Sequence, residues 1–440
     1  MKRAVLKWGA ALALGAFAQV ISTVALADDA TQQLVRRGEY LARVGDCIAC
    51  HTASSGKPFA GGLPIQSPVG TIYSTNITPD TATGIGSYTY EDFERAVRQG
   101  ISKQGYSLYP AMPYPSYAHV HDDDMHALYA YFMHGVAPVS QPDRAEGIAW
   151  PMSMRWPLTF WRWAFAPKVE ASSPPPGTYP EIARGAYLVE GLAHCSACHT
   201  PRGVGMQELA LTAQQGSAFL SGGGQLDNWI ATNLRSDPAT GLGLWSEADL
   251  ETFLKSGATD HTAAFGGMTD VVQHSTQYMT DADRTAIAKY LKSLPGAKGE
   301  VAPTYDAAVS TAMHSGDVTR PGAETYLNSC AACHRSDGKG YASVFPALAL
   351  NPVVTGSDPT SLIHIVLAGS STPTTQAAPA QFTMPPYGWR LSDTEVANVL
   401  TLLRSSWGNH APQVTAAQVA KVRAAIPVAS LGAAPNPNAR

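Results

Sequence analysis

The six cysteines of this 440-residue chain all belong to three copies of one motif, Cys-x-x-Cys-His. Residues three positions apart lie on one face of a helical turn, so both thiols of a copy can bond to the same porphyrin. The histidine that follows can then bind the iron, as in covalently attached c-type haem. The sequence therefore predicts three haem c groups, with covalent attachment at Cys47, Cys50, Cys195, Cys198, Cys330 and Cys333 and iron ligation by His51, His199 and His334.

Paired cysteines of this kind have two other common uses, a redox-active disulfide and half of a zinc site. Two pairs could build one zinc ribbon, but the third pair would be left over. Neither use requires a histidine directly after every pair. The repetition of the complete motif therefore favours haem attachment.

Each haem motif is followed, well downstream, by a methionine in a loop that precedes a predicted helix. An iron that only transfers electrons needs a second strong axial ligand, and a methionine thioether opposite histidine raises the reduction potential. We predict that Met112, Met268 and Met384 supply this ligand, because prolines stiffen two of these loops and a pair of glycines opens the third. The residues that compete for the role are Met125 and Met133 in the first repeat and His261 and Met279 in the second.

Several of the competing residues have simpler explanations. A lone methionine is usually core filler, and Met125 and Met133 fall on a predicted helix where a core position suffices. The first repeat also contains a run of histidines for which hydrogen bonding or solvation is the default role, namely His119, His121, His126 and His134.

The haem motifs are parts of a longer repeat. A glycine and an aromatic residue precede each copy on a short predicted helix, within residues 37–41, 184–188 and 322–327. A second helix closes each repeat, with apolar residues at i, i+3 and i+4 after a start rich in acidic or hydroxyl side chains. The first two repeats also share a loop, in which Thr75-Asn76 and Thr83-Gly84-Ile85-Gly86 match Thr232-Asn233 and Thr240-Gly241-Leu242-Gly243. The third repeat lacks this loop and is a more distant copy.

These repeats predict a mostly α-helical protein with three tandem, class-I-like cytochrome c domains, each holding one haem. The expected domains are residues 28–139, 181–295 and 321–412, joined by a Trp- and Pro-rich linker at 140–180 and a second linker at 296–320, and followed by a tail at 413–440. The first linker is unusually aromatic. It is either a connector packed across the first two domains or a docking patch for a partner or the lipid interface.

The first 27 residues have the pattern of a secretory signal peptide. Basic residues precede an apolar run, and Ala25-Leu26-Ala27 fits a cleavage site. The alternative is an uncleaved membrane anchor. Export agrees with haem attachment outside the bacterial cytoplasm, so we expect the protein at the periplasmic face of the cytoplasmic membrane.

Composition narrows the range of partners. The chain has 30 basic and 34 acidic residues, and no basic footprint for nucleic acid is present. After the signal segment, no apolar run reaches the roughly 18 residues that a membrane span needs. The Ala- and Val-rich tail is broken by charges and a proline. It is expected to be a short amphipathic helix or a disordered end, with a membrane-surface or docking role as the alternative.

Beyond the haem motifs, longer strings resemble a known family, the triheme cytochrome c subunits of membrane-bound bacterial dehydrogenases. These strings include Tyr109-Pro110-Ala111-Met112-Pro113-Tyr114, Met154-Arg155-Trp156-Pro157-Leu158 and Cys198-His199-Thr200-Pro201-Arg202. Within that family the chain is most similar to the subunit of gluconate 2-dehydrogenase, with the alcohol dehydrogenase subunit close behind.

The resemblance implies an electron-transfer role without a catalytic residue in this chain. Electrons would come from a large dehydrogenase subunit, carrying FAD in the gluconate enzyme or PQQ in the alcohol enzyme. A small subunit is a further candidate partner. They would pass to ubiquinone through peripheral contact with the membrane. Two other functions remain as alternatives, a multihaem peroxidase, which the three matched methionines disfavour, and a free-standing soluble carrier.

Overall fold

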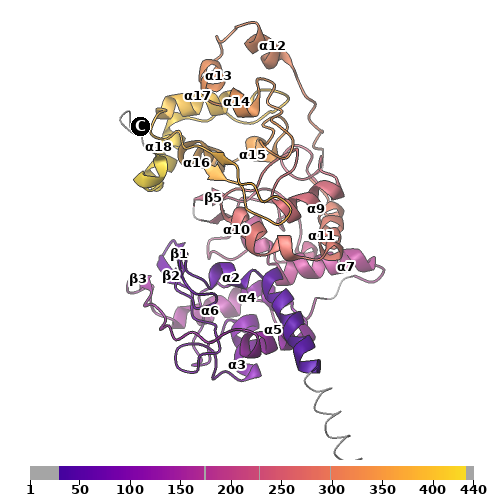
Figure 1. The fold of residues 1–440 in the computed structure, drawn as a ribbon, viewed down its shortest axis with the longest axis vertical. Helices are drawn as coiled ribbons and strands as arrows, with labels where there is room; N and C mark the ends of the chain where they lie inside the picture. The colour runs from indigo at the N-terminus through magenta and orange to yellow at the C-terminus, as the bar shows by residue number, and fades with distance from the viewer. Residues whose placement is uncertain (1–28, 173–174, 227, 298, 433–440) are drawn as a thin grey trace, which may run out of the picture.

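The computed structural model describes residues 29–172, 175–226, 228–297 and 299–432. The predicted signal peptide therefore lies outside the described residues. The protein is mostly helical, as the sequence predicts. Figure 1 shows three regions stacked along the long axis in chain order, with the region of the first haem motif at the bottom and that of the third at the top.

The first region surrounds the first haem motif. A helix runs through residues 29–44 and leads into α2 (Cys47–Cys50). A small antiparallel sheet of order β1-β2-β3 follows, and its third strand comes from the aromatic linker. The remaining elements are β1 (Pro64–Ser67), β2 (Gly70–Tyr73), β3 (Gly147–Ile148), α3 (Tyr90–Gln99), α4 (Tyr114–Tyr117), α5 (Asp122–His134) and, in the linker, α6 (Trp156–Phe165).

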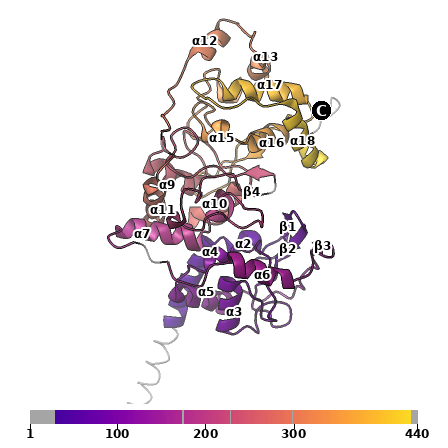
Figure 2. The ribbon, with the colours of Figure 1, turned by 180° about the vertical axis from the view of Figure 1, so that it is seen from behind.

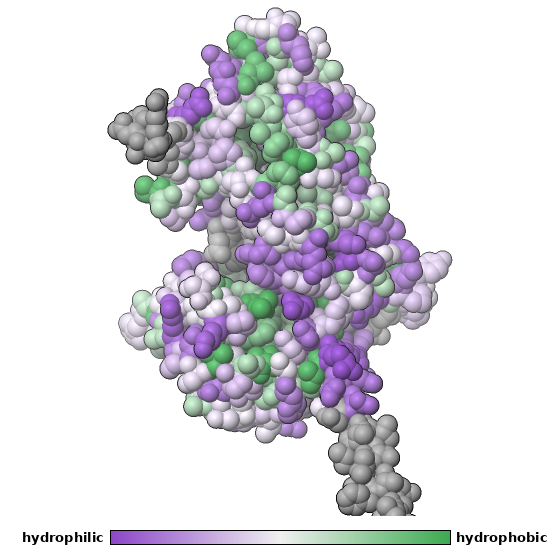
Figure 3. All heavy atoms as spheres, in the orientation of Figure 1, coloured by the Kyte–Doolittle hydropathy of each residue, from purple (hydrophilic) through white to green (hydrophobic). Residues whose placement is uncertain are grey.

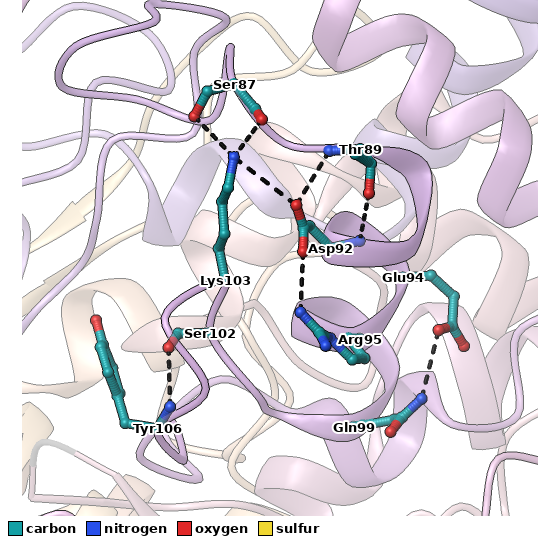
Figure 4. A network of polar contacts seen from close by, with 9 residues as sticks. All are labelled: Ser87, Thr89, Asp92, Glu94, Arg95, Gln99, Ser102, Lys103 and Tyr106. Carbon is teal, nitrogen blue, oxygen red and sulfur yellow. Dashed lines mark hydrogen bonds and ion pairs between the residues drawn. The ribbon is translucent and has the colours of Figure 1, made fainter.

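Local chemistry determines where α3 begins and ends. Thr89 caps its first turn in a reciprocal box with Asp92, and the helix stops at Gly100, whose φ of 63° suits glycine. Figure 4 shows that Asp92 also meets Arg95 at 2.9 Å and Lys103 at 3.8 Å. The network holds α3 and the loop after it together at the surface.

The second region repeats this order. The leading helix α7 runs into a π-helical turn before the motif, and α10 lies between α9 and the closing helix. Its elements are α7 (Pro180–Tyr187), η1 (Leu188–Leu192), α8 (Ser196–His199), η2 (Ala213–Gln215), β4 (Gln225–Leu226), β5 (Trp229–Ile230), α9 (Glu247–Ser256), α10 (Gly267–His274), η3 (Thr276–Tyr278) and α11 (Asp281–Ser293).

The third region has its own hydrophobic core. The segment predicted as a tail contributes to it, because Val419 and Val422 of α18 are buried there. Its elements are α12 (Ala308–His314), α13 (Ala323–Ser329), α14 (Ala331–His334), α15 (Pro352–Thr355), α16 (Thr360–Ala368), β6 (Ser370–Ser371), β7 (Thr383–Met384), α17 (Asp393–Arg404), α18 (Ala416–Ala425) and η4 (Val428–Leu431).

The repeated glycines explain how the leading and closing helices pack. In each region the glycine lies where the leading helix meets the closing one, so that a side chain would collide with backbone. A Cβ would approach a carbonyl oxygen to 1.9 Å at Gly38 (Ala127), 2.0 Å at Gly185 (Ala286) and 2.5 Å at Gly322 (Asn398). The same close crossing therefore supports all three haem motifs.

On the face drawn in Figure 3, hydrophilic residues form a band across the middle of the molecule, between more hydrophobic areas above and below. Within the described ranges, no helix combines the length and apolarity needed to cross a bilayer.

Candidate functional site

The three haem motifs lie on one-turn helices, α2, α8 and α14. One helical turn brings the two thiols of a motif and its histidine to neighbouring positions. All six cysteines belong to the described part of the chain, and none of them forms a disulfide. Burial raises the pKa of Cys47, Cys195 and Cys330 to about 12. The first cysteine of each motif is therefore held as a neutral thiol.

Each of the three histidines makes the same second contact. Its Nδ1 faces a backbone carbonyl, at 2.7 Å in His51 (Thr75), 2.7 Å in His199 (Thr232) and 2.9 Å in His334 (Pro346). A carbonyl only accepts, so Nδ1 must carry the proton and Nε2 keeps its lone pair. Nε2 is thus the nitrogen available to a metal in all three motifs.

Burial lowers the pKa of all three imidazoles, against the opposing effect of the carbonyl bond. A neutral imidazole is the form that binds iron. The residues present therefore fit a covalently held haem in each region, with paired thiols and an oriented, neutral imidazole.

The loop shared by the first two repeats supplies the carbonyl for the histidine. Directly after Thr75, the Asn76 side chain accepts from the amide of Thr78 at 2.9 Å. After Thr232, Asn233 accepts from the amide of Arg235 at 2.9 Å. This asparagine turn fixes the direction of the preceding carbonyl. The sequence contained this signal as the repeated Thr-Asn string, but its link to the histidine appears only in three dimensions.

The three predicted methionine ligands are half-buried, at the margins of the cores. Met112 precedes α4 and packs against the first core. Met268 lies in the first turn of α10. Met384 lies on β7, opposite Ser370 of β6, and packs against the third core. Only Met112 therefore lies in a loop, as predicted, whereas Met268 is helical and Met384 is on a short strand. Each side chain is partly exposed, which suits an axial ligand, and the assignment stays a prediction.

The competing residues are engaged elsewhere. Met125 and Met279 belong to the hydrophobic core of the first two regions and are 0% and 3% exposed, and Met133 packs against that core. His261 lies 3.3 Å from Asp249 and stacks on Trp245.

The run of histidines in the first region has the roles expected of it. The rings of His119 and His121 face the carbonyls of Glu170 and Ser172, both at 3.3 Å. His126 and His134 are exposed, and His126 also stacks on Tyr90.

The second region touches the other two near their sites. The ring of His194, directly before Cys195, faces the carbonyl of Gly45, two residues before Cys47, at 3.2 Å, so the first two motifs are near neighbours. The second region also contacts the third. Thr269, next to Met268, donates to the carbonyl of Ser371 at 3.4 Å. Ser371 directly follows Ser370, the residue that pairs with Met384 across the short sheet. The second site therefore lies between the first and the third.

Comparison with known proteins gives consistent results. The family model of cytochrome c matches residues 182–295 and 319–407. The chain is 57% identical to the gluconate 2-dehydrogenase cytochrome c subunit of Pantoea cypripedii, over 94% of each chain. It is 56% identical to the cytochrome c subunit of the quinone alcohol dehydrogenase of Gluconacetobacter polyoxogenes, over 93% of this chain and 89% of the relative. The fructose dehydrogenase cytochrome subunit of Gluconobacter japonicus is 38% identical, over 90% of this chain and 85% of the relative.

Proposed function

Because the chain belongs to the cytochrome c subunits of bacterial dehydrogenases, we propose that it carries three haems c and conducts electrons from a catalytic dehydrogenase subunit to ubiquinone. Family membership itself makes electron transfer through haem c its role. The number of haems and the acceptor are the proposed part. The observation that supports three haems is the identical orientation of His51, His199 and His334 by backbone carbonyls.

In this proposal the protein holds each haem in the same way. The paired cysteines anchor the porphyrin, the histidine Nε2 is one iron ligand, and Met112, Met268 or Met384 is the other. Haem iron supplies a one-electron couple when bound. The chain orients the imidazole, keeps it neutral by burial and limits ligand movement through the segments that hold each thioether.

The arrangement of the regions suggests a sequence of three domains with the second in the middle. The second domain contacts the first at Gly45, two residues before Cys47, and the third at Ser371. We therefore propose that electrons enter at one outer domain and leave at the other.

The partner is proposed from the relatives. A flavoprotein large subunit, as in gluconate 2-dehydrogenase, is the first choice, and a PQQ-containing alcohol dehydrogenase is the alternative. The identities of 57% and 56% explain why the chain alone does not separate them. A small third subunit can complete the complex. We place it at the periplasmic face of the cytoplasmic membrane, after export with the predicted signal peptide, in peripheral contact with lipid.

Mass spectrometry of the denatured protein tests the haem count. We expect three covalent haems in the wild type and two in a Cys330→Ala, Cys333→Ala variant. A Ser405→Ala variant, with an exposed hydroxyl in the same domain, should retain three. A wild-type mass with fewer than three haems contradicts the proposal.

Purification of the native complex tests the partner and the acceptor. We expect a co-purifying dehydrogenase subunit and substrate-dependent reduction of a ubiquinone analogue. Identification of its cofactor as flavin or PQQ then decides between the two partners. Peroxide turnover by the isolated chain would instead support the peroxidase alternative, and purification without any partner would support the soluble carrier.

A further inference from the structure

Helix α6, in the aromatic linker, has a well-packed inner side. Trp161 donates from its indole nitrogen to the carbonyl of Gly205 at 2.6 Å. Its ring also meets Tyr114 edge-to-face, with centroids 6.2 Å apart. This side therefore joins the first domain to a loop of the second, as a connector would.

The opposite side of α6 is also apolar but faces outward. Trp156, Phe160 and Trp163 follow one another at i, i+4 and i+7 and are 63%, 64% and 86% exposed. The loop before the helix adds Trp150 and Met152, which are 79% and 59% exposed. Figure 2 shows α6 on the near surface of the first domain. We call these five residues the α6 aromatic face.

An exposed apolar surface of this size is expected to contact a partner or lipid. A helix that is apolar all round is normally buried in a core or in lipid, and contiguous exposed apolar areas on soluble proteins usually mark interaction sites. The helix has ten residues, so it is about 15 Å long and too short to span a bilayer. The length of the helix therefore allows contact along one side only, with the helix axis parallel to the surface that it contacts.

The charge of the surrounding residues indicates what binds to this face. The chain as a whole has a formal net charge of −4, yet residues 147–169 contain no acidic residue and carry Arg155, Arg162 and Lys168. Arg155 is paired with Glu146, whereas Lys168 is exposed beside the helix end. The nearest acids in sequence are Glu146, which is paired with Arg155, and Glu170, just after the segment. Exposed aromatic rings beside a cation, on a segment without an acid of its own, match the headgroup region of an anionic bilayer.

We propose that the α6 aromatic face is the lipid-contacting surface of this protein and lies flat in the headgroup region of an anionic membrane. This inference rests on the proposed function, since it locates the peripheral membrane contact that transfer to ubiquinone requires. Trp150, Met152, Phe160 and Trp163 would enter the acyl boundary while Lys168 meets lipid phosphates. A dehydrogenase subunit is the competing occupant, because tryptophan and arginine are also frequent at protein interfaces.

Vesicle flotation of the haem-loaded protein, as exported and processed by an expression host, tests the proposal. We expect binding to vesicles that contain phosphatidylglycerol, and binding weaker by about fivefold to pure phosphatidylcholine vesicles. A Phe160→Ser, Trp163→Ser variant should bind the anionic vesicles about a hundredfold more weakly, because it removes two large apolar groups. Tyr179→Ser, at an aromatic side chain 75% exposed outside this face, should change binding by less than about twofold.

The absorption spectrum shows whether each variant retains its haems. Quinone reduction in detergent separates the proposed electron-transfer function from the proposed lipid contact. Loss of vesicle binding with intact detergent activity supports the lipid-contacting role. The lipid-contacting role is overturned if the wild-type protein does not bind anionic vesicles, or if the double variant binds them as well as the wild type. If the double variant keeps vesicle binding but no longer assembles with the dehydrogenase subunit, the face is a protein interface instead. Failure of quinone reduction in every form, with vesicle binding intact, counts against the proposed function alone.

Discussion

The junction between the first and second domains is reciprocal, whereas the junction between the second and third is not. Asp124 of the first domain receives Arg37 of its own leading helix at 2.8 Å and Tyr187 of the second domain at 2.5 Å. The second domain repeats the pattern in reverse. There Asp283 receives its own Arg184 at 2.8 Å and Tyr40 of the first domain at 2.5 Å.

This exchange of tyrosines is accompanied by a common core. A single hydrophobic cluster contains Leu41 and Leu128 from the first domain and Leu188 and Ile287 from the second. Polar contacts at its edge also cross the junction, such as Ser275 donating to the carbonyl of Val44 at 3.1 Å. The first two domains are therefore packed as one unit.

The third domain is attached mainly by polar and aromatic contacts. Its core is separate. Ser361 accepts from the amide of Ile230 at 2.7 Å and donates to the carbonyl of the same residue at 3.0 Å. His364 stacks on Trp229, with ring centroids 3.9 Å apart. The comparison indicates a rigid pair of domains and a third that can separate without exposing a shared core.

The largest effect should come from removing one of the shared carboxylates. Asp124→Ala leaves the hydroxyl of Tyr187 without its acceptor and Arg37 without its partner. We expect a loss of about 2–3 kcal/mol, below the full cost of breaking a buried pair because Arg37 is half exposed.

Denaturant unfolding, followed by haem absorbance, measures this loss. Both haem transitions of the first two domains should move together, while that of the third stays in place. The exposed neighbour Asp123→Ala is the control. A shift confined to the first domain would show that the two domains do not form one cooperative unit.

The tyrosines test the symmetry of the junction. Tyr40→Phe and Tyr187→Phe each remove one hydroxyl from a mirrored position, so we expect equal losses of about 1–2 kcal/mol in the free energy of unfolding. Tyr129→Phe is a matched control, because that hydroxyl bonds to Tyr88 within the first domain. The reciprocal interpretation fails if one substitution destabilises strongly and the other has no effect.

The sequence predicted more of the repeat than of the junctions. The helices that lead into and close each domain follow from the spacing of glycines and apolar residues, and the histidine positions follow from the motif itself. The tyrosine exchange was missed, although Arg-Gly-x-Tyr occurs in both leading helices at 37–40 and 184–187. Such a string shows that the residues repeat but not that each tyrosine bonds to the other domain, since Tyr40 and Asp283 are 243 positions apart. The methionine ligands remain predictions, because their sulfurs are placed by segments outside the motif.

A smaller effect is expected at the other junction. Ser361→Ala removes both bonds to Ile230 and leaves a backbone amide without its acceptor, which should weaken attachment of the third domain by about 1–2 kcal/mol. The linker can be cut near Val301, which is 83% exposed, so that the third domain is held only by the junction. Size-exclusion chromatography should then show the cut domain dissociating at higher protein concentration than in the wild type. Ser405→Ala, within the third domain, should dissociate like the wild type, and identical dissociation of the Ser361 variant would contradict the importance of this bond.

The smallest effect is a pH dependence of the second junction. Burial lowers the pKa of His364 from its usual 6.5, against the opposing effect of the hydrogen bond that its Nδ1 donates to the carbonyl of Asn228. Because the pKa of His364 is lowered in the folded state, the attached domain favours the neutral imidazole. The contribution of His364 to attachment is therefore complete above pH 6.5 and is lost as the pH falls through the lowered pKa. The cut protein should therefore release its third domain more readily at mildly acidic pH, and His364→Phe, which keeps a ring on Trp229, should remove most of this dependence. The first junction has its own histidine, because burial lowers the pKa of His194 and its ring faces the carbonyl of Gly45 at 3.2 Å, so the acid response of that junction should be unchanged in the His364 variant. Equal acid sensitivity of the third domain in the wild type and in His364→Phe would contradict this assignment.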